Sequence, residues 1–127
     1  MLLRRLKARS QFVATAKGVR AHRPTLSLQR RDRADGDDAI GVGFTVTNKE
    51  GNSPERNRIR RRFRAIARDM LPAAGSAGCD YVIIGRRAAL DCPFPSLTRD
   101  LKEALAEAEK RAAKGAKGAP PTLPSTD

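Results

Sequence analysis

Apolar and polar positions alternate most clearly between residues 39 and 47. Every second position there is apolar: Ile40, Val42, Phe44 and Val46. The positions between them hold only glycine or threonine. A period of two predicts a strand whose apolar face lies in the core. Small residues on the opposite face indicate a place where another group approaches the backbone, although an ordinary solvated face fits the pattern equally well.

Two further strands are expected. Residues 25–29 alternate in the same way, with Leu26 and Leu28 on one side. The polar run that follows at residues 30–38 is typical of a hairpin loop. Residues 80–85 instead hold a continuous apolar run. Such a run is typical of a strand that is buried on both faces and therefore covered by helices.

Three helices are predicted from capping residues and helical spacing. The first is short and spans residues 10–18, with serine as its cap and glycine at its end. The second begins with Ser53 as its cap and runs to about Met70, before Pro72. The third is capped by Ser96. Its apolar stripe consists of Leu97, Leu101, Ala104, Leu105 and Ala108.

The order of these elements is helix, strands, helix, buried strand and helix. This order indicates a small α+β domain with a sheet of a few strands. We assign the domain to residues 1–113. Residues 114–127 are dominated by Gly, Ala, Pro, Ser and Thr, a composition that predicts a disordered tail.

The distribution of charge points to the kind of partner. The chain has 26 Lys and Arg against 14 Asp and Glu, a formal net charge of +12. Nine of the basic residues lie in residues 1–31 and seven arginines lie in residues 56–68, and neither segment contains an acid. The rest of the chain is slightly acidic. Two strongly basic segments on an acidic body predict a polyanionic partner.

Several classes of protein are disfavoured. No run approaches the roughly 18 apolar residues of a membrane span, and residues 1–10 lack the apolar core of a secretory signal. An organelle transit peptide is a minor alternative, since residues 1–31 are rich in arginine and free of acids. Cys79 and Cys92 lack the spacing and the histidine partners of a zinc site. We therefore expect a protein of the reducing cytoplasm, with no membrane partner.

The second predicted helix separates its residues by face. At about 100° per residue, its apolar side chains fall within one arc: Ile59, Phe63, Ile66 and Met70. A second arc holds Asn57, Arg60, Arg61, Arg64 and Arg68. The first arc is expected to pack on the core and the second to face solvent. Arg58 and Arg62 flank the apolar arc, where we expect peripheral roles.

The basic arc favours nucleic acid as the partner. Guanidinium groups packed within two turns repel one another, and no acid intervenes before Asp69. Phosphates placed between them relieve this repulsion, because each guanidinium can donate two hydrogen bonds to a phosphate. A membrane-surface helix needs a second exposed apolar face, which this helix lacks. RNA is favoured over DNA, since the flanking segments are strand-like and form no helix-turn-helix.

The run Arg-Asn-Arg-Ile-Arg-Arg at residues 56–61, followed by Arg64, resembles the signature of the protein subunit of bacterial ribonuclease P. The strand before it and the buried strand after it have the spacing of that family. Phe12 in the first helix and Lys49 before the second support the resemblance. It covers about residues 3–112.

The resemblance implies an α-β sandwich similar to a ribosomal-protein fold, with about four strands and a left-handed βαβ crossover around the arginine helix. In this family the catalytic subunit is an RNA, which removes the 5′ leader of precursor tRNA with the help of magnesium ions. The protein binds that RNA and the leader. The chain is thus expected to be an accessory subunit of a ribonucleoprotein endonuclease, with no catalytic or metal-binding residue of its own and magnesium held mainly by RNA.

The resemblance also implies roles for particular residues. Phe12 and Thr45 would line a cleft for the 5′ leader, next to the glycines of the small strand face. The residues that would meet RNA are Lys49, Arg56, Asn57, Arg58, Arg60, Arg61 and Arg64. Arg58 lies off the main basic arc, and bracing of the loop before the helix is an alternative for it. Ala16 and Leu28 stand where relatives often carry aromatics, so base stacking is weaker or differently placed.

Two other functions fit parts of the pattern. A ribosomal or general RNA-binding protein with no processing role would show the same basic helix. A nuclease that acts alone is less favoured, because the carboxylates are scattered and His22 is the single histidine.

Overall fold

The computed structural model describes residues 3–118 of the 127-residue chain. In chain order its elements are β1 (Leu3–Arg5), α1 (Arg9–Ala16), β2 (Val19–His22), β3 (Leu26–Asp32), β4 (Ile40–Thr45), the 3₁₀ turn η1 (Asn48–Glu50), α2 (Ser53–Ala74), β5 (Cys79–Gly85), the 3₁₀ turn η2 (Arg87–Ala89) and α3 (Phe94–Gly118).

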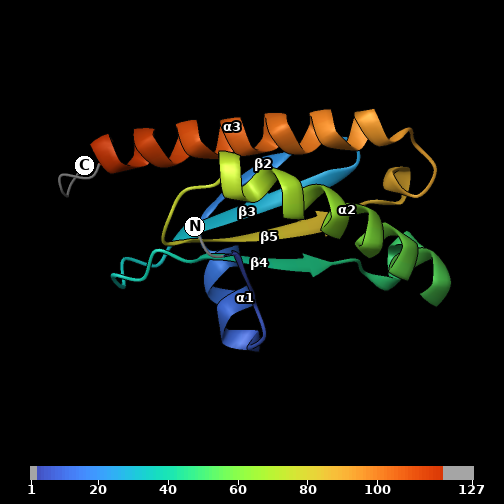
Figure 1. Cartoon of the computed structure of the whole chain (residues 1–127), viewed down its shortest axis with the longest axis horizontal. Helices are drawn as coiled ribbons and strands as arrows, with labels where there is room; N and C mark the ends of the chain where they lie inside the picture. The colour runs from blue at the N-terminus through green and yellow to red at the C-terminus, as the bar shows by residue number, and fades with distance from the viewer. Residues whose placement is uncertain (1–2, 119–127) are drawn as a thin grey trace.

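The five strands form one sheet in the order β1-β4-β5-β3-β2. β5 lies at the centre, parallel to β4 and antiparallel to β3. Helices α2 and α3 cover one face, and α1 packs against the other (Figure 1). The predicted α+β sandwich is confirmed, with five strands in place of four. β1 and β2 hold only three and four residues, too few to show a period of two.

The chain passes from β4 to its parallel neighbour β5 through α2. In Figure 1 both strands point to the right, β5 lies above β4, and α2 lies in front of them. This arrangement makes the crossover left-handed, as the family resemblance implied and against the general rule. The arginine-rich first half of α2 consequently lies near the carboxyl ends of both strands.

Residues 30–38 do not form the hairpin loop that the polar run predicted. β3 continues to Asp32, which pairs with Cys79 of β5. β5 lies between β3 and β4, so these two strands are not neighbours. The prediction was wrong because the strand that separates them comes much later in the chain, where no local signal could show it.

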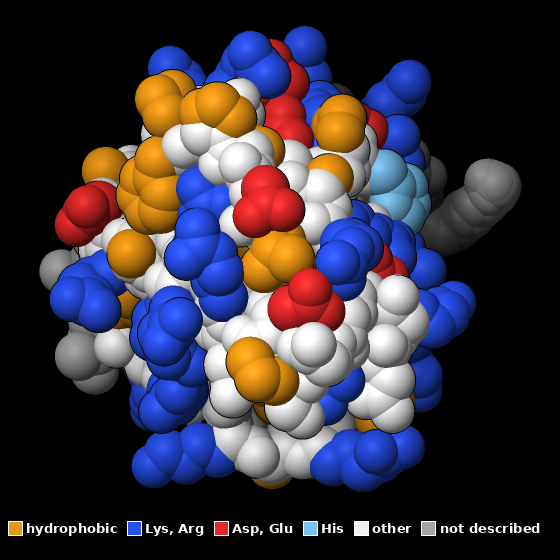
Figure 2. Space-filling model, turned by 90° about the vertical axis from the view of Figure 1, so that its right-hand side faces the viewer, with side chains coloured by type: hydrophobic (Ala, Val, Ile, Leu, Met, Phe, Trp, Pro, Cys, Tyr) orange, Lys and Arg blue, Asp and Glu red, His pale blue; other side chains and the backbone are white. Residues whose placement is uncertain are grey.

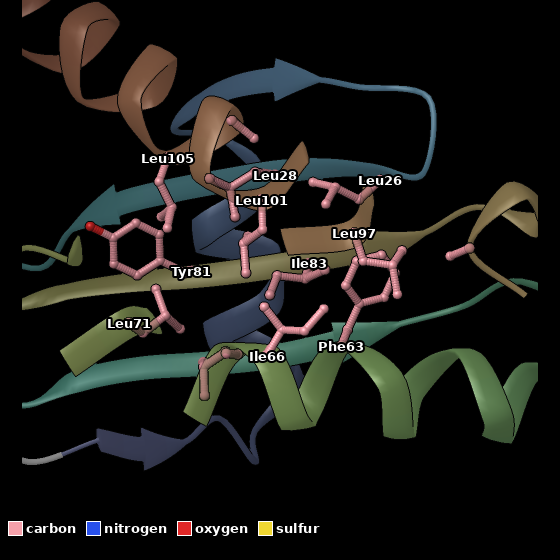
Figure 3. Close-up of a cluster of buried hydrophobic side chains, with 14 of the residues drawn as sticks. Leu26, Leu28, Phe63, Ile66, Leu71, Tyr81, Ile83, Leu97, Leu101 and Leu105 are labelled. Carbon is pink, nitrogen blue, oxygen red and sulfur yellow. The ribbon is translucent and has the colours of Figure 1, made fainter. Parts of the chain in front are cut away.

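The main core lies between the sheet and helices α2 and α3 (Figure 3). All five apolar positions predicted for the last helix are buried, as is the predicted stripe of α2 apart from the partly buried Met70. The ring of Tyr81 also lies in this core. Its hydroxyl donates to Glu109 at 3.0 Å and accepts from the backbone N–H of Ser76 at 2.9 Å. The polar end of this buried side chain is therefore satisfied.

Helix α2 is longer than predicted at both ends. Asn52, not Ser53, is its cap: Asn52 Oδ1 accepts from the Glu55 backbone N–H at 3.0 Å. In return, the Glu55 carboxylate accepts from the Asn52 N–H at 2.9 Å, which completes a capping box. The helix continues through Pro72 to Ala74, so the proline does not end it.

The first and last helices also begin earlier than their predicted caps. α1 starts at Arg9, so Ser10 lies inside it. α3 starts at Phe94, which places Ser96 in its first turn. The cap of α1 is Ala8, two residues before Ser10, and the cap position of α3 is residue 93, three residues before Ser96.

The predicted tail overlaps the end of α3. This helix extends to Gly118, so residues 114–118 are helical. Residues 119–127 lie outside the described residues, and a disordered tail there stays a prediction.

The face of the sheet that α1 covers carries a buried ion-pair cluster. Asp80 of β5 is 1% exposed, and its carboxylate accepts from Arg33 Nη1 at 2.7 Å and from Arg31 Nη2 at 2.8 Å. A Cβ at Gly41 would approach Asp80 Oδ1 to 2.1 Å, so the glycine makes room for the carboxylate. The cluster ties the end of β3 and the loop after it to the central strand.

We expect Asp80→Asn to lower the free energy of unfolding by about 3 kcal/mol, because it leaves two guanidinium groups without their buried counter-ion. Urea denaturation at neutral pH measures the change. Exposed Asp38→Asn is the matched control, with an expected effect within about 0.5 kcal/mol. Equal unfolding free energies for the two variants would show that the cluster contributes nothing.

Candidate RNA-binding site

The exposed side of α2 carries the polar arc that the sequence predicted, and we call it the arginine face. It consists of Asn57, Arg60, Arg61, Arg64 and Arg68. Arg60 and Arg64 are partly buried, and the other three are exposed. Arg60 Nη1 donates to Asn57 Oδ1 at 2.6 Å, which orients both side chains. Figure 2 shows Lys and Arg side chains gathered along the side of the molecule on which α2 lies.

Glu55, in the first turn of α2, forms an ion pair with Arg87 of the turn η2. Glu55 accepts from Arg87 Nη1 at 3.2 Å and Nη2 at 3.0 Å. These hydrogen bonds, together with the one from the Asn52 N–H, lower the pKa of the Glu55 carboxyl. The carboxylate also suits the positive end of the helix. Arg87 therefore has a counter-ion within the protein, whereas no ion pair among residues 3–118 involves an arginine of the arginine face.

Three arginines of the same helix hold the backbone of adjacent segments. Arg56 Nη1 donates to the carbonyl of Gly51 at 2.8 Å, in the loop before α2. Arg58 Nε donates to one carbonyl of segment 89–92 at 3.1 Å. Arg62 donates to three carbonyls of that segment at 2.5 to 3.1 Å. Arg58 therefore braces the segment after β5, and it is Arg56 that braces the loop before the helix.

The small face of β4 is covered by the protein itself. A Cβ at Gly43 would lie 2.4 Å from Cε1 of Phe12, and one at Gly41 would lie 2.7 Å from Leu6. Both glycines are buried. They allow α1 and the segment before it to approach the strand closely, so the face is not open at these two positions. The expectation of an open face holds only toward Thr45.

A pocket of about 400 Å³ lies at this end of β4. Its lining consists of Lys7, Arg9, Phe12, Phe44 and Thr45. The structure thus brings together Phe12 and Thr45, the two residues predicted for a leader cleft. An aromatic ring beside a hydroxyl and two cations suits single-stranded RNA, because the ring can stack on a base while the cations attract the backbone.

The sequence pattern predicted only part of the role of Phe44. Strand alternation predicted a core position, yet Phe44 is only partly buried and lines the pocket. The guanidinium of Arg64 lies over its ring, 5.6 Å from the centroid. Phe44 therefore connects the pocket to the arginine face. Lys7 and Arg9 were also missed as individual residues, although the acid-free start of the chain was a signal for them.

Lys49 lies in η1, the turn that leads into α2, and is exposed. Its position near the N-terminus of α2 places a further cation close to the first turn of the arginine helix. Whether Lys49 and the arginine face contact RNA stays a prediction.

A family model described as ribonuclease P matches residues 3–109. The chain belongs to the ribonuclease P protein family. It is similar to the ribonuclease P protein component of Paramagnetospirillum magneticum, with 45% identity over 107 residues that cover 81% of this chain and 80% of that protein. The corresponding protein of Ruegeria pomeroyi is 42% identical over 102 residues, which cover 79% and 82%.

Solved structures of ribonuclease P proteins share the fold. The protein from Staphylococcus aureus matches with a TM-score of 0.70 and 24% identity, covering 83% of this chain and 94% of that one. The protein from Thermotoga maritima matches with a TM-score of 0.65 and 24% identity, covering 76% and 90%. These structural matches, at 24% identity, establish that this chain has the fold of ribonuclease P proteins.

The magnesium that the ribonuclease P resemblance implies has no evident donor set on the protein. Within the described part of the chain, no three His, Cys, Asp or Glu side chains come together as a metal site requires. None of the helices up to Gly118 has the length and apolarity that a bilayer crossing requires.

Gly43→Ala tests the contact that positions Phe12. Because the new Cβ would overlap the Phe12 ring, we expect the free energy of unfolding to fall by about 1–3 kcal/mol. Thermal and urea denaturation of Gly43→Ala, Phe12→Leu and the double variant form a cycle. Leucine at position 12 should leave room for part of the new methyl group at position 43. The double variant should therefore lose less stability than the sum of the two single losses. Strict additivity would contradict the contact.

Proposed function

We propose that this protein is the accessory subunit of a ribonucleoprotein endoribonuclease that removes the 5′ leader of precursor tRNA. Its arginine face binds the catalytic RNA, and the pocket between α1 and β4 binds the leader. The observation that carries the proposal is the junction at Arg64 and Phe44, where a basic helix face meets an aromatic pocket. A single-stranded substrate and a folded RNA can thus be held side by side.

The charges on α2 support RNA as the ligand of the arginine face. Among residues 3–118, the ion pairs involve arginines of other segments. Arg60, Arg61 and Arg64 take part in none of them. Guanidinium groups without a carboxylate partner on one helix face can each donate to a phosphate of a nucleic acid backbone. The protein supplies few acids there to compete for them.

The pocket favours a processing role over general RNA binding. A subunit that only coats folded RNA needs cations, whereas the pocket adds the ring of Phe12 and the hydroxyl of Thr45. Aromatic stacking is the usual way in which proteins hold unpaired bases. Phe44 supplies a second aromatic at the pocket, in a chain that has Ala16 and Leu28 where relatives often carry aromatics.

In this proposal the magnesium ions belong mainly to the RNA subunit. The protein's cations neutralise phosphates of catalytic RNA and leader, which reduces the repulsion that magnesium would otherwise have to screen. The protein thereby lowers the magnesium concentration needed for assembly and substrate binding, without holding the reacting atoms.

Cleavage assays with precursor tRNA test this role. We expect the purified protein alone to cut nothing. Added to the catalytic RNA, it should lower the magnesium and RNA concentrations required for 5′ leader removal, because it strengthens substrate binding. Robust cleavage by the RNA-free protein would contradict the proposal, and RNA binding with no effect on cleavage would favour a general RNA-binding protein.

Arg60→Ala and Arg64→Ala test the arginine face. Each variant should weaken binding to the catalytic RNA and reduce the magnitude of the salt slope, log Kd against log salt concentration, by about 0.7–0.9, because each removes one phosphate contact. Filter binding across a salt series measures both quantities.

Arg62→Ala is the matched control on the same helix. Its guanidinium is occupied by backbone carbonyls, so we expect an unchanged salt slope and a loss of about 1–3 kcal/mol in unfolding free energy. If Arg62→Ala changed the slope as much as Arg60→Ala, the division between arginines that hold backbone carbonyls and arginines that contact phosphates would be wrong.

A further inference from the structure

A slot outside the two surfaces described above lies between α2 and α3. It has a volume of about 360 Å³, and its lining consists of Ile66, Asp69, Met70, Phe94 and Thr98. Phe94, the first residue of α3, is 44% exposed. An aromatic ring therefore stands partly open to solvent in a slot of mixed polarity, beside the arginine-rich helix α2.

The ring of Phe94 is held by a fixed cation. The Arg62 guanidinium lies over it, 5.4 Å from the ring centroid. Hydrogen bonds to three carbonyls of segment 89–92 hold that guanidinium in place. Arg62 and Phe94 form a preorganised stacked pair, and such a wall binds a flat ligand with little loss of side-chain freedom.

The polar groups of the slot discriminate between ligands. Asp69 is the first acid after the arginine run and is exposed. Its carboxylate disfavours a phosphate inside the slot but accepts hydrogen bonds from a ring with donor groups at its edge. Among the four RNA bases, guanine alone presents two adjacent donors, N1–H and N2–H, on its Watson–Crick edge.

We propose that this slot takes one unpaired guanine of an RNA whose backbone follows the arginine face. The proposal rests on the proposed function, because it needs RNA on α2. The base stacks on Phe94 above Ile66 and Met70, and its N1–H and N2–H donate to Asp69. The arginine face then attracts the phosphates on either side of the base. Asp69 contacts the base and not a phosphate, so an acid is compatible with an RNA-binding helix.

Photo-crosslinking of the full-length protein tests the position of the base. The probe is a short oligouridylate with one central 6-thioguanosine, irradiated in complex with the protein and mapped by mass spectrometry of the digested protein. We expect adducts on the residues that line the slot, chiefly Phe94 and Met70. Phe94→Ala should remove most of these adducts while the protein still binds the oligonucleotide.

Base discrimination provides an independent readout. We compare the affinity of the protein for oligouridylates that contain one guanosine or one inosine, which lacks the N2 amino group. The guanosine form should bind about tenfold more tightly, as expected for one hydrogen bond to a charged group. Asp69→Asn should bring this ratio close to one, even though removal of the negative charge raises overall affinity for RNA.

Two further variants separate stacking from loss of fold. Phe94→Leu keeps apolar volume and should retain part of the affinity that Phe94→Ala loses. Val13→Ala removes an apolar side chain of similar exposure, 46%, from α1 on the opposite side of the sheet. It should leave both the crosslink and the guanosine-to-inosine ratio unchanged. Melting curves confirm that each variant is folded.

The outcomes distinguish this inference from the function on which it rests. RNA binding with the expected salt slope, but with adducts elsewhere and no preference for guanosine, would overturn the slot and leave the proposed function intact. Absence of RNA binding would overturn both. Self-association of the RNA-free protein that Phe94→Ala abolishes would assign the slot to a second copy of the chain and overturn the guanine proposal.

Discussion

The hydrogen-bonded position of β5 between β4 and β3 determines where both candidate surfaces of this protein lie. Because β4 and β5 are parallel neighbours, the chain must cross from one to the other, and α2 makes that crossing above them. The arginine face is thereby placed near the carboxyl ends of both strands. On the other side of the sheet, Asp80 of the same central strand anchors Arg31 and Arg33, beside the glycines against which α1 packs.

The arginines of α2 look alike in sequence but divide into two groups in the structure. Arg56, Arg58 and Arg62 donate to backbone carbonyls and so hold the loop before α2 and the segment after β5. Arg60 and Arg61 instead stay outside the ion pairs of the described residues. Helix α2 thus uses some of its cations as internal hydrogen-bond donors, which leaves fewer guanidinium groups close together on the arginine face and limits their repulsion.

The long elements could be predicted from the sequence, because the apolar stripes of α2 and α3 and the apolar run of β5 indicate directly which residues are buried. The sequence also placed the arginine face, since helical geometry follows from spacing alone. It could not show that β5 separates β3 from β4, because strand order depends on contacts distant in the chain. Nor could it show that Phe12 fills the space above Gly43, or that Arg62 finds carbonyls some thirty residues away. These contacts depend on how distant segments pack together in the folded protein, and neither the hydrophobic period nor the composition of the sequence indicates them.

The position of Arg64 over the ring of Phe44 has a consequence for energetics. One guanidinium belongs to both the helix face and the pocket, so a ligand that reorients it on one side alters the other. Such coupling is reciprocal by thermodynamic linkage. If, as proposed, the catalytic RNA strengthens binding of the leader, the leader must strengthen binding of the catalytic RNA by the same factor. Under the proposed function, departure of the cut leader would then weaken binding of the catalytic RNA by that same factor.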